Sequence, residues 1–224
     1  MLYIVATPIG NLKDITLRAL EVLKEVDGII CEDSRRTSLL LNHYQIKKPL
    51  LVLNDYNEAR VFPSIVEKLK IGENLVLVSD AGTPLISDPG YKLVRTCLEE
   101  NIPVDSLPGP ASPVVALTLS GLPPDKFLFL GYLPEKPGKR TALLNQLPAI
   151  SHTLPTTFIA FISPHKLIKT LEDMLQVYGN LEVVLAHELT KVHQSVKKDS
   201  LKNWLSKFKT QKPKGEYVLL FNLS

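Results

Sequence analysis

The sequence predicts an α/β fold with two lobes, and three observations lead to that prediction. Short apolar runs alternate with amphipathic segments through residue 107, which is typical of a mostly parallel sheet covered by helices on both faces. Proline and glycine then interrupt the chain twice between residues 108 and 124. A second set of apolar runs follows, for which we expect a mixed sheet. The expected parts are an N-terminal lobe over 1–112, a connecting helix or linker over 113–122, and a C-terminal lobe over 123–224.

In the first lobe, each short apolar run is followed by a segment with helical spacing of its apolar residues. Thr16 precedes a row of leucines and suits a helix N-cap, while Gly72 suits the end of a later helix. The expected strands are 2–6, 28–31, 50–53, 75–79 and 104–107. The expected helices are 16–26, 36–44, 57–71 and 91–100.

The second lobe has fewer regular alternations. Ser163 and Pro164 predict a helix start, because serine can cap the helix and proline suits its first turn, and Gly179 predicts the end of that helix. Residues 134–140 (PEKPGKR) are expected to form an exposed basic loop. The other expected helices are 111–120, 141–150 and an amphipathic helix within 197–213. The expected strands are 127–132, 156–162, 181–186 and 216–223.

Composition excludes several classes of protein. Of the 224 residues, 45% are hydrophobic and 22% are charged, as in an ordinary globular protein rather than a disordered one. No apolar run approaches the roughly 18–20 residues of a membrane span, and the first residues predict a strand rather than a signal peptide. Cys31 and Cys97 stand alone in apolar surroundings, which predicts reduced core residues and a cytoplasmic protein.

Charge is unevenly distributed along the chain. Residues 1–120 hold 12 Lys and Arg against 15 Asp and Glu, whereas residues 121–224 hold 14 against 8, and the net charge is +3. A basic second half is compatible with a polyanionic substrate held mainly by one lobe. It is equally compatible with a solvated, lysine-rich surface, so charge alone leaves both interpretations open.

The run 75–90 (LVLVSDAGTPLISDPG) carries the strongest local signal. Four apolar residues lead into Ser79 and Asp80, and a loop with two further turns follows at once. Open α/β sheets place their ligands at the carboxyl ends of such strands, so this loop is expected to hold a cofactor. We expect four other loops at strand ends to converge with it on a cleft between the lobes. These are 7–11, 107–112, 161–165 and 187–191.

Several common chemical signatures are absent from the sequence. There is no G-x-G-x-x-G after the first strand, no P-loop and no G-x-S-x-G elbow. The histidines and cysteines lack metal-ligand spacing, so no metal site is predicted.

The motifs at the strand ends resemble those of a known family. They are TPIGNLKDITLRAL near the start, ICEDSRRT at 30–37, SDAGTPLISDPG at 79–90 and PGPAS at 108–112. Together they resemble the tetrapyrrole methylase superfamily, and within it the branch of small-subunit (16S) ribosomal RNA methyltransferase I, which 2′-O-methylates a cytidine ribose in the decoding region. The later segments GYLPEKPGKR, SPHK, HELTK and KGEYVLLF fit the same branch.

The resemblance implies a class III methyltransferase-like architecture, S-adenosyl-L-methionine as cofactor and a homodimer. It implies small-subunit ribosomal RNA as the partner, either free or in the assembled 30S particle, and no membrane. The residues that it implies for cofactor binding are Pro8, Gly10, Asp80, Gly82, Thr83, Pro84, Ala111, Ser112, Phe161, Ile162, Leu189, Lys214 and Gly215. For Asp80, a turn- or helix-capping role is the alternative.

Attack by a ribose hydroxyl would be helped by a base or a polarising cation. The candidates are Asp33, Glu188 and Lys191, but Asp33 also suits a helix cap, and Glu188 with Lys191 also suits a surface salt bridge. The candidates for holding RNA phosphates are Arg35, Arg36, Lys136, Lys139 and Arg140, for which solvated positions are the alternative.

Two other functions remain compatible with these residues. One is methylation of a tetrapyrrole or another small molecule, and the other is a non-catalytic, ribosome-binding role. The basic second lobe favours RNA as the acceptor, and the intact loops at 80–90 and 108–112 favour an active enzyme.

Overall fold

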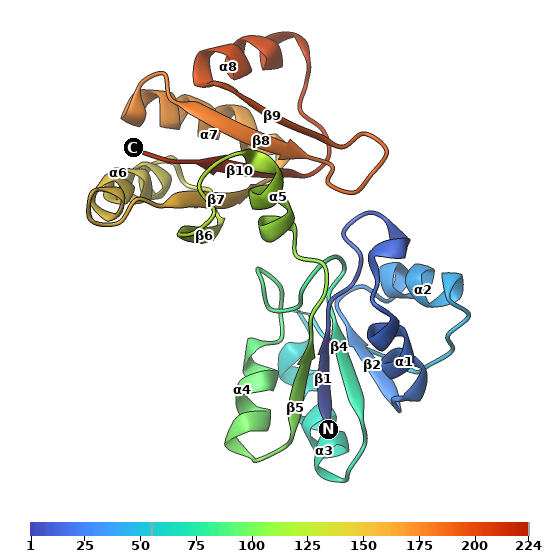
Figure 1. The fold of residues 1–224 in the computed structure, drawn as a ribbon. Coiled ribbons are helices and arrows are strands. Elements are labelled where there is room, and N and C mark those ends of the chain that lie inside the picture. Colours follow the sequence, from blue (N-terminus) through green and yellow to red (C-terminus); the bar gives the residue numbers. More distant parts are fainter. Residues whose placement is uncertain (55, 224) are drawn as a thin grey trace. The chain divides into compact units, whose positions relative to one another are not determined.

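Two five-stranded sheets form the framework of the protein, one in each of its two compact units (Figure 1). The computed structural model describes residues 1–54 and 56–223. The first unit is Met1–Ala111 and the second is Ser112–Ser224.

The first unit is a parallel sheet with the strand order β3-β2-β4-β1-β5. Its strands are β1 (Leu2–Val5), β2 (Gly28–Cys31), β3 (Leu50–Val52), β4 (Leu75–Val78) and β5 (Val104–Leu107). The connections contain the short 3-10 helix η1 (Leu12–Asp14) and the helices α1 (Leu17–Glu25), α2 (Ser34–His43), α3 (Glu58–Lys70) and α4 (Tyr91–Glu99).

Alternating apolar side chains explain why this sheet is covered on both faces (Figure 1). Val76 and Val78 of β4 belong to a core with α1 and α2, whereas Leu75 and Leu77 belong to a second core with α3 and α4. Each core also takes one of the two free cysteines, both of which are buried. The mostly parallel sheet expected for the first lobe is therefore confirmed.

Polar side chains set the starts of two helices in this unit. The Thr16 hydroxyl accepts a hydrogen bond from the Ala19 N–H at 3.1 Å, as its position in the sequence indicates. Asp33 caps α2 by accepting from the Arg35 N–H at 2.9 Å. Because of this cap, α2 begins at Ser34, two residues before the expected start.

The second unit contains a mixed sheet with the order β6-β7-β10-β8-β9, as expected. Only β6 and β7 pair in parallel, and the remaining pairs are antiparallel. The strands are β6 (Phe127–Tyr132), β7 (Thr157–Ile162), β8 (Glu182–His187), β9 (Ser195–Ser200) and β10 (Tyr217–Phe221). The helices are α5 (Ser112–Ser120), α6 (Pro137–Thr153), α7 (Pro164–Tyr178) and α8 (Leu201–Thr210).

Three helices share one face of this second sheet. Leu147 of α6, Leu171 of α7 and Trp204 of α8 pack in one core with Phe158 and Leu219 of the sheet. Helix α5 contacts β7, β8, β9 and β10 and buries Ala116 and Leu117. It therefore belongs to the second unit by its packing.

Three local features of this unit differ from what the sequence predicts. The basic loop is shorter than expected, because α6 begins at Pro137, which suits the first turn of a helix. Strand β9 was not predicted, since its sequence SVKKDS lacks alternating apolar residues. Helix α7 begins at Pro164 and ends before Gly179 as expected, but Ser163 at its N-cap position makes no side-chain capping hydrogen bond.

Among the described residues, no helix has the length and apolar character needed to span a bilayer.

Candidate functional site

Three strand-end loops of the first unit are joined at the carboxyl edge of its sheet. Thr7, after β1, and Gly82, after β4, exchange two backbone hydrogen bonds of 2.9 and 3.0 Å. The Thr7 hydroxyl donates to the Ser79 carbonyl at 3.1 Å, and the Thr83 hydroxyl donates to the Pro110 carbonyl at 2.9 Å. These bonds hold the loops after β1, β4 and β5 in one arrangement before any ligand arrives.

Two glycines allow these loops to approach closely. Gly82 has φ +89°, and a Cβ there would lie 3.3 Å from Ile9 Cγ2. A Cβ on Gly109 would lie 2.8 Å from Ala6 Cβ, which is closer than side-chain carbons pack. Main chain is thus presented directly at the edge where a ligand is expected.

The same edge gathers carboxylates. Asp80 accepts a hydrogen bond from the Asp33 N–H at 3.2 Å, and its Oδ2 lies 3.4 Å from Arg36 Nε. Burial raises the pKa of Asp88 to about 6, and the negative charges of Glu32 and Asp80 contribute to this rise. A hydrogen bond from Ser79 lowers the pKa and so opposes part of the rise. The result is a negative edge suited to a ligand with positive groups.

Of the two roles considered for Asp80, the hydrogen bonds of the structure show the capping one. One oxygen stabilises the start of α2 through the Asp33 N–H, which is the capping alternative. A carboxylate has about four acceptor sites, and the Asp80 side chain is 24% exposed, so it keeps capacity for a ligand.

Asp33 is already engaged by Arg35, which binds it through Nε at 3.0 Å and through a terminal nitrogen at 2.6 Å. The side-chain hydrogen bond from Arg35 lowers the pKa of Asp33 to about 2. A carboxylate of such low basicity is a poor proton acceptor at neutral pH. The Arg35 side chain is 88% exposed and the Arg36 side chain 60% exposed, so both guanidinium groups reach solvent.

The other first-unit candidates from the sequence lie on the same three loops. Pro8 is half-buried and Gly10 is exposed in the loop after β1, and Pro84 is buried behind Thr83. Ala111 ends the loop after β5 and is half-buried. Ser112 is the first residue of α5 and belongs to the second unit.

Sequence reasoning missed two acidic residues of this region. Asp88 lies within the motif at 79–90, but only the fold reveals its burial near Glu32. Asp14 ends η1, and its Oδ2 is buried without a hydrogen-bond partner among the described residues. The sequence does not indicate that this oxygen is buried, because an acidic residue between strands and helices is usually solvated.

Strand register brings a second group of candidates to one edge of the second sheet. Tyr217, at the start of β10, pairs with Ile162 of β7 on one side and His187 of β8 on the other. The segments 161–162, 187–191 and 214–215 therefore meet at this edge.

Glu188, Lys191 and Glu216 form a charged network there. Lys191 Nζ lies 3.0 Å from Glu188 Oε1 and 2.9 Å from Glu216 Oε2. Burial favours a higher pKa for Glu188, but hydrogen bonds from the Glu216 N–H and from Lys191 lower its pKa overall. Burial likewise opposes the charge on Lys191, yet its bonds to Glu216 and Glu188 raise its pKa. The network keeps Glu188 anionic and Lys191 cationic.

The backbone around this network is constrained. Glu188 and Thr190 adopt φ values of +49° and +63°, which residues other than glycine rarely adopt. Gly215 has φ +76°, and a Cβ there would lie 2.6 Å from Glu188 Oε1, so another residue would be strained and would displace the Glu188 carboxylate. His187 Nε2 hydrogen-bonds the Lys214 carbonyl at 2.8 Å, and its ring stacks on Tyr217.

The remaining cofactor candidates of the second unit differ in exposure. Phe161 is half-buried and packs edge-on against Phe129, with ring centroids 4.9 Å apart. Ile162 and Leu189 are buried, with 4% and 6% exposure, so only their main chain is placed to meet a ligand.

One predicted RNA contact is corrected. Arg140 is 1% exposed, and its Nε donates to Asp173 Oδ2 at 2.8 Å while a terminal nitrogen donates to the Pro134 and Glu135 carbonyls. We therefore remove Arg140 from the RNA-binding candidates, because its guanidinium is enclosed by protein. Lys136 and Lys139 are exposed at the start of α6.

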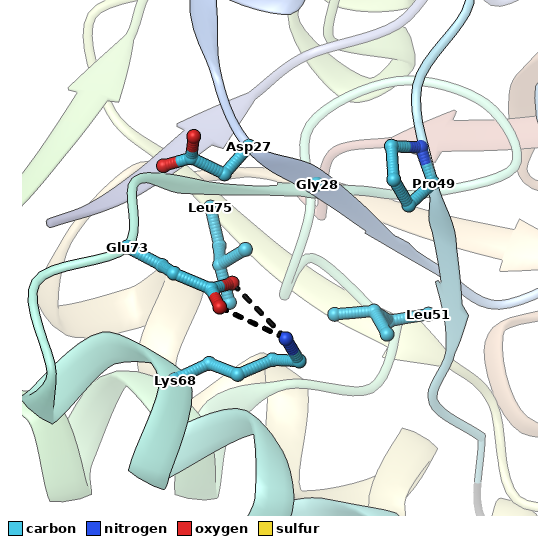
Figure 2. A pocket seen from close by; sticks show the side chains of 7 residues that line it. All are labelled: Asp27, Gly28, Pro49, Leu51, Lys68, Glu73 and Leu75. Atoms are coloured by element: carbon cyan, nitrogen blue, oxygen red, sulfur yellow. Dashed lines mark hydrogen bonds and ion pairs between the residues drawn. The ribbon is translucent and has the colours of Figure 1, made fainter.

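A pocket of about 250 Å³ lies at the opposite, amino end of the first sheet (Figure 2). Lys68 and Glu73 form an ion pair of 2.9 Å in its lining, and Asp27 accepts a hydrogen bond from the Asn74 N–H. Because this pocket lies at the amino ends of the strands, it is separate from the loops at their carboxyl ends. Its lining residues are Asp27, Gly28, Pro49, Leu51, Lys68, Glu73 and Leu75. No group of three potential metal ligands occurs among the described residues.

Comparison with known sequences identifies close similarities. Residues 1–204 match the sequence model of the family described as Tetrapyrrole (Corrin/Porphyrin) Methylases. The chain is 45% identical to "Ribosomal RNA small subunit methyltransferase I" of Thermotoga maritima over 221 residues, covering 99% of this chain and 97% of that protein. It is 48% identical to the protein of the same name from Escherichia coli O157:H7, covering 98% of this chain and 76% of that protein.

Solved structures share the fold. A crystal structure of diphthine synthase has a TM-score of 0.74 at 17% identity, covering 99% of this chain and 89% of that one. A cobalt precorrin-4 methyltransferase has a TM-score of 0.69 at 18% identity, covering 98% and 94%. At such identities the likeness establishes the architecture alone, and it confirms the predicted fold class.

Proposed function

The chain belongs to the tetrapyrrole (corrin/porphyrin) methylase family, and on that premise we propose that it 2′-O-methylates a cytidine ribose of small-subunit ribosomal RNA. The relatives' shared name supports ribosomal RNA as the acceptor. The decoding region as the place of modification is the finer part of this proposal, and it is supported by the resemblance of the motifs.

The observation that carries the proposal is the joined loop edge of the first unit. S-adenosyl-L-methionine, the cofactor of this family, supplies an activated methyl group on a sulfonium and also carries an ammonium group. The residues of the edge fit it, since Asp80, Asp88 and Glu32 provide negative charge beside main chain exposed by Gly82. Asp80 has acceptor capacity left for ribose hydroxyls or the ammonium group.

We assign to this edge the task of orientation. Methyl transfer is an in-line displacement, so holding the two reacting groups in line supplies much of the acceleration. Loops that are already fixed by the Thr7–Gly82 and Thr83–Pro110 bonds lose little further freedom when they bind the cofactor.

We assign to Lys191 the polarisation of the acceptor hydroxyl. It is held as a cation by Glu188 and Glu216, and a cation beside the oxygen would stabilise the alkoxide that remains when the hydroxyl proton passes to water. That oxygen would then take the methyl group, and the sulfonium would leave as a neutral thioether. Glu188 then acts as the residue that positions Lys191, because its lowered pKa makes it a weak base. Asp33 similarly orients Arg35, whose exposed guanidinium, with that of Arg36, is proposed to contact RNA phosphate.

The partners are part of the same proposal. Lys136 and Lys139 remain candidates for phosphate contacts, and Pro8, Gly10, Ala111, Ser112, Phe161, Ile162, Leu189, Lys214 and Gly215 remain candidates for cofactor contacts. A homodimer, a cytoplasmic location and action on either free RNA or the 30S particle are supported by the family resemblance. Light scattering of the purified protein tests the dimer by its mass.

The cofactor edge is tested by calorimetric titration of S-adenosyl-L-methionine into matched variants. Asp80→Asn keeps an oxygen for the Asp33 N–H and removes the charge, so we expect affinity to fall about ten- to a hundredfold. Asp27→Asn is the control, since Asp27 also accepts a backbone N–H, from Asn74 at 2.8 Å, but lies at the opposite end of the sheet. Equal affinities for Asp80→Asn and Asp27→Asn would refute the assignment.

A further inference from the structure

The segment 195–214 of the second unit is strongly basic. It contains seven lysines and a single acidic residue, Asp199. The Asp199 carboxylate is occupied by the Ser200 N–H at 2.8 Å and by Asn203 Nδ2 at 2.7 Å. Little negative charge is therefore available within the segment to neutralise its lysines.

Most of these lysines point away from the protein. Helix α8 buries Leu201, Trp204 and Phe208 in the core, whereas Lys202, Lys207 and Lys209 are exposed. In the part of the chain that the structure describes, Lys198 is the one lysine of this segment that forms an ion pair, with Glu182 at 2.8 Å.

Structural roles explain some of these lysines but not all. Lysines on an edge strand such as β9 prevent pairing with other sheets, which accounts for Lys197 and Lys198. Lys207 and Lys209 lie in the last turn of α8, where positive charge suits the helix dipole. Lys202 lies in the first turn, where the dipole disfavours a cation, and Lys212 lies beyond the helix.

The segment begins and ends at the edge that holds Lys191. Ser195, the first residue of β9, pairs with His187, and β9 runs from there to Ser200, which pairs with Glu182 at the far edge. Helix α8 then returns over about 15 Å, and the chain reaches Lys214 and Gly215 beside Glu188. The lysines of α8 thus lie on the stretch of chain that returns to the proposed acceptor edge of the same unit, with Lys202 and Lys209 on one side of the helix and Lys207 over the Trp204 ring.

We propose that Lys202, Lys207, Lys209 and Lys212 form a binding surface for the phosphate backbone of the RNA substrate. The proposal deepens the function proposed above and depends on it. A basic amphipathic helix can also bind an anionic membrane, but that mode inserts the apolar face into lipid. Here the apolar face is already buried in the protein core, so a phosphate backbone is the better match.

The test replaces Lys202, Lys207 and Lys209 together with Gln and measures binding of unmodified small-subunit ribosomal RNA at several salt concentrations. Binding weakens as salt rises, so log K against log[salt] has a negative slope. Three fewer phosphate contacts should make this slope less steep by about 2. Replacement of the same three lysines with Arg should retain the wild-type slope. Affinity for S-adenosyl-L-methionine should stay unchanged in both variants. The Gln variant should lose only a small part of its stability, because Lys207 contacts the Trp204 ring and Lys207 and Lys209 suit the helix dipole, whereas the Arg variant should keep the wild-type melting temperature.

The matched control replaces three first-unit lysines, Lys24, Lys47 and Lys48, with Gln and should leave the salt slope unchanged. An unaltered slope in the α8 variant, with wild-type protein still methylating the RNA, would overturn this inference and leave the proposed function intact. The inference would also be overturned if the α8 variant lost binding to phosphatidylserine vesicles but kept its binding to RNA. Absence of RNA methylation by the wild-type protein would instead refute the proposed function.

Discussion

Gly82 is the residue at which backbone conformation and the proposed function meet most directly. Its φ of +89° strains any other residue, and a Cβ would press on Ile9 within the joined loops. We predict that Gly82→Ala destabilises the protein by about 1 to 3 kcal/mol and also weakens binding of S-adenosyl-L-methionine.

Gly72 provides the matched control for this prediction. It has φ +98°, but a Cβ there would meet nothing within 4 Å. Gly72→Ala should therefore lose a similar stability in urea denaturation and keep its cofactor affinity in calorimetry. If both variants bind the cofactor equally well, Gly82 does not shape the site.

We expect Asp88 to make the free energy of unfolding depend on pH. Its pKa is about 6 in the folded protein against an ordinary value of 3.8, so the folded state binds the proton more tightly than the unfolded state. The contribution of Asp88 to stability should therefore rise as pH falls from about 6 towards 4.

Substitution of Asp88 separates this contribution from those of other carboxyl groups. Asp88→Asn should be more stable than wild type at pH 7.5, and the difference should shrink at pH 4, in urea denaturation at each pH. A stability difference that does not change with pH would show that Asp88 titrates normally.

The buried contact of Arg140 with Asp173 indicates a role in stability, whereas the sequence predicts an RNA contact for this residue. Removing it leaves Asp173 buried without its partner, so Arg140→Ala should cost about 3 to 5 kcal/mol in urea denaturation. Its exposed neighbour Lys139 is the control, and Lys139→Ala should change stability by less than about 0.5 kcal/mol. Equal small effects would mean that the buried pair is not formed.

At the scale of helices, two N-cap positions differ in a way that the sequence does not reveal. Thr16 makes its capping bond to Ala19, whereas Ser163 makes none. Thr16→Ala should therefore cost about 1 kcal/mol and Ser163→Ala much less, as thermal unfolding monitored by circular dichroism can show. The reverse order would contradict the capping assignment.

The success of prediction for individual elements depends on how local their signals are. The strands Gly28–Cys31 and Phe127–Tyr132 have the expected bounds, because charged residues border the first apolar run on both sides, and Lys126 and Pro134 limit the second. Strand β9 is held by pairing with β8, a partner distant from any pattern in its own six residues. The burial of Arg140 is equally non-local, since Asp173 is 33 residues away.

Across each whole unit, strand order determines which candidates meet. The motifs predicted that strand-end loops would carry the site. Hydrogen bonds join three of these loops in the first unit, and the register of β10 brings two of them in the second unit close to the segment 214–215 that precedes β10. The network of Lys191 with Glu216 and the buried oxygen of Asp14 could not be predicted, because each depends on the packing of residues separated along the chain.

Methyl transfer to ribosomal RNA can be measured directly. Purified protein is incubated with labelled S-adenosyl-L-methionine and under-methylated small ribosomal subunits, and nuclease fragments of the RNA are then mapped by mass spectrometry. We predict one added methyl group on the ribose of a cytidine in the decoding region. Label on a base, or no label in the RNA while the cofactor still binds, would contradict it.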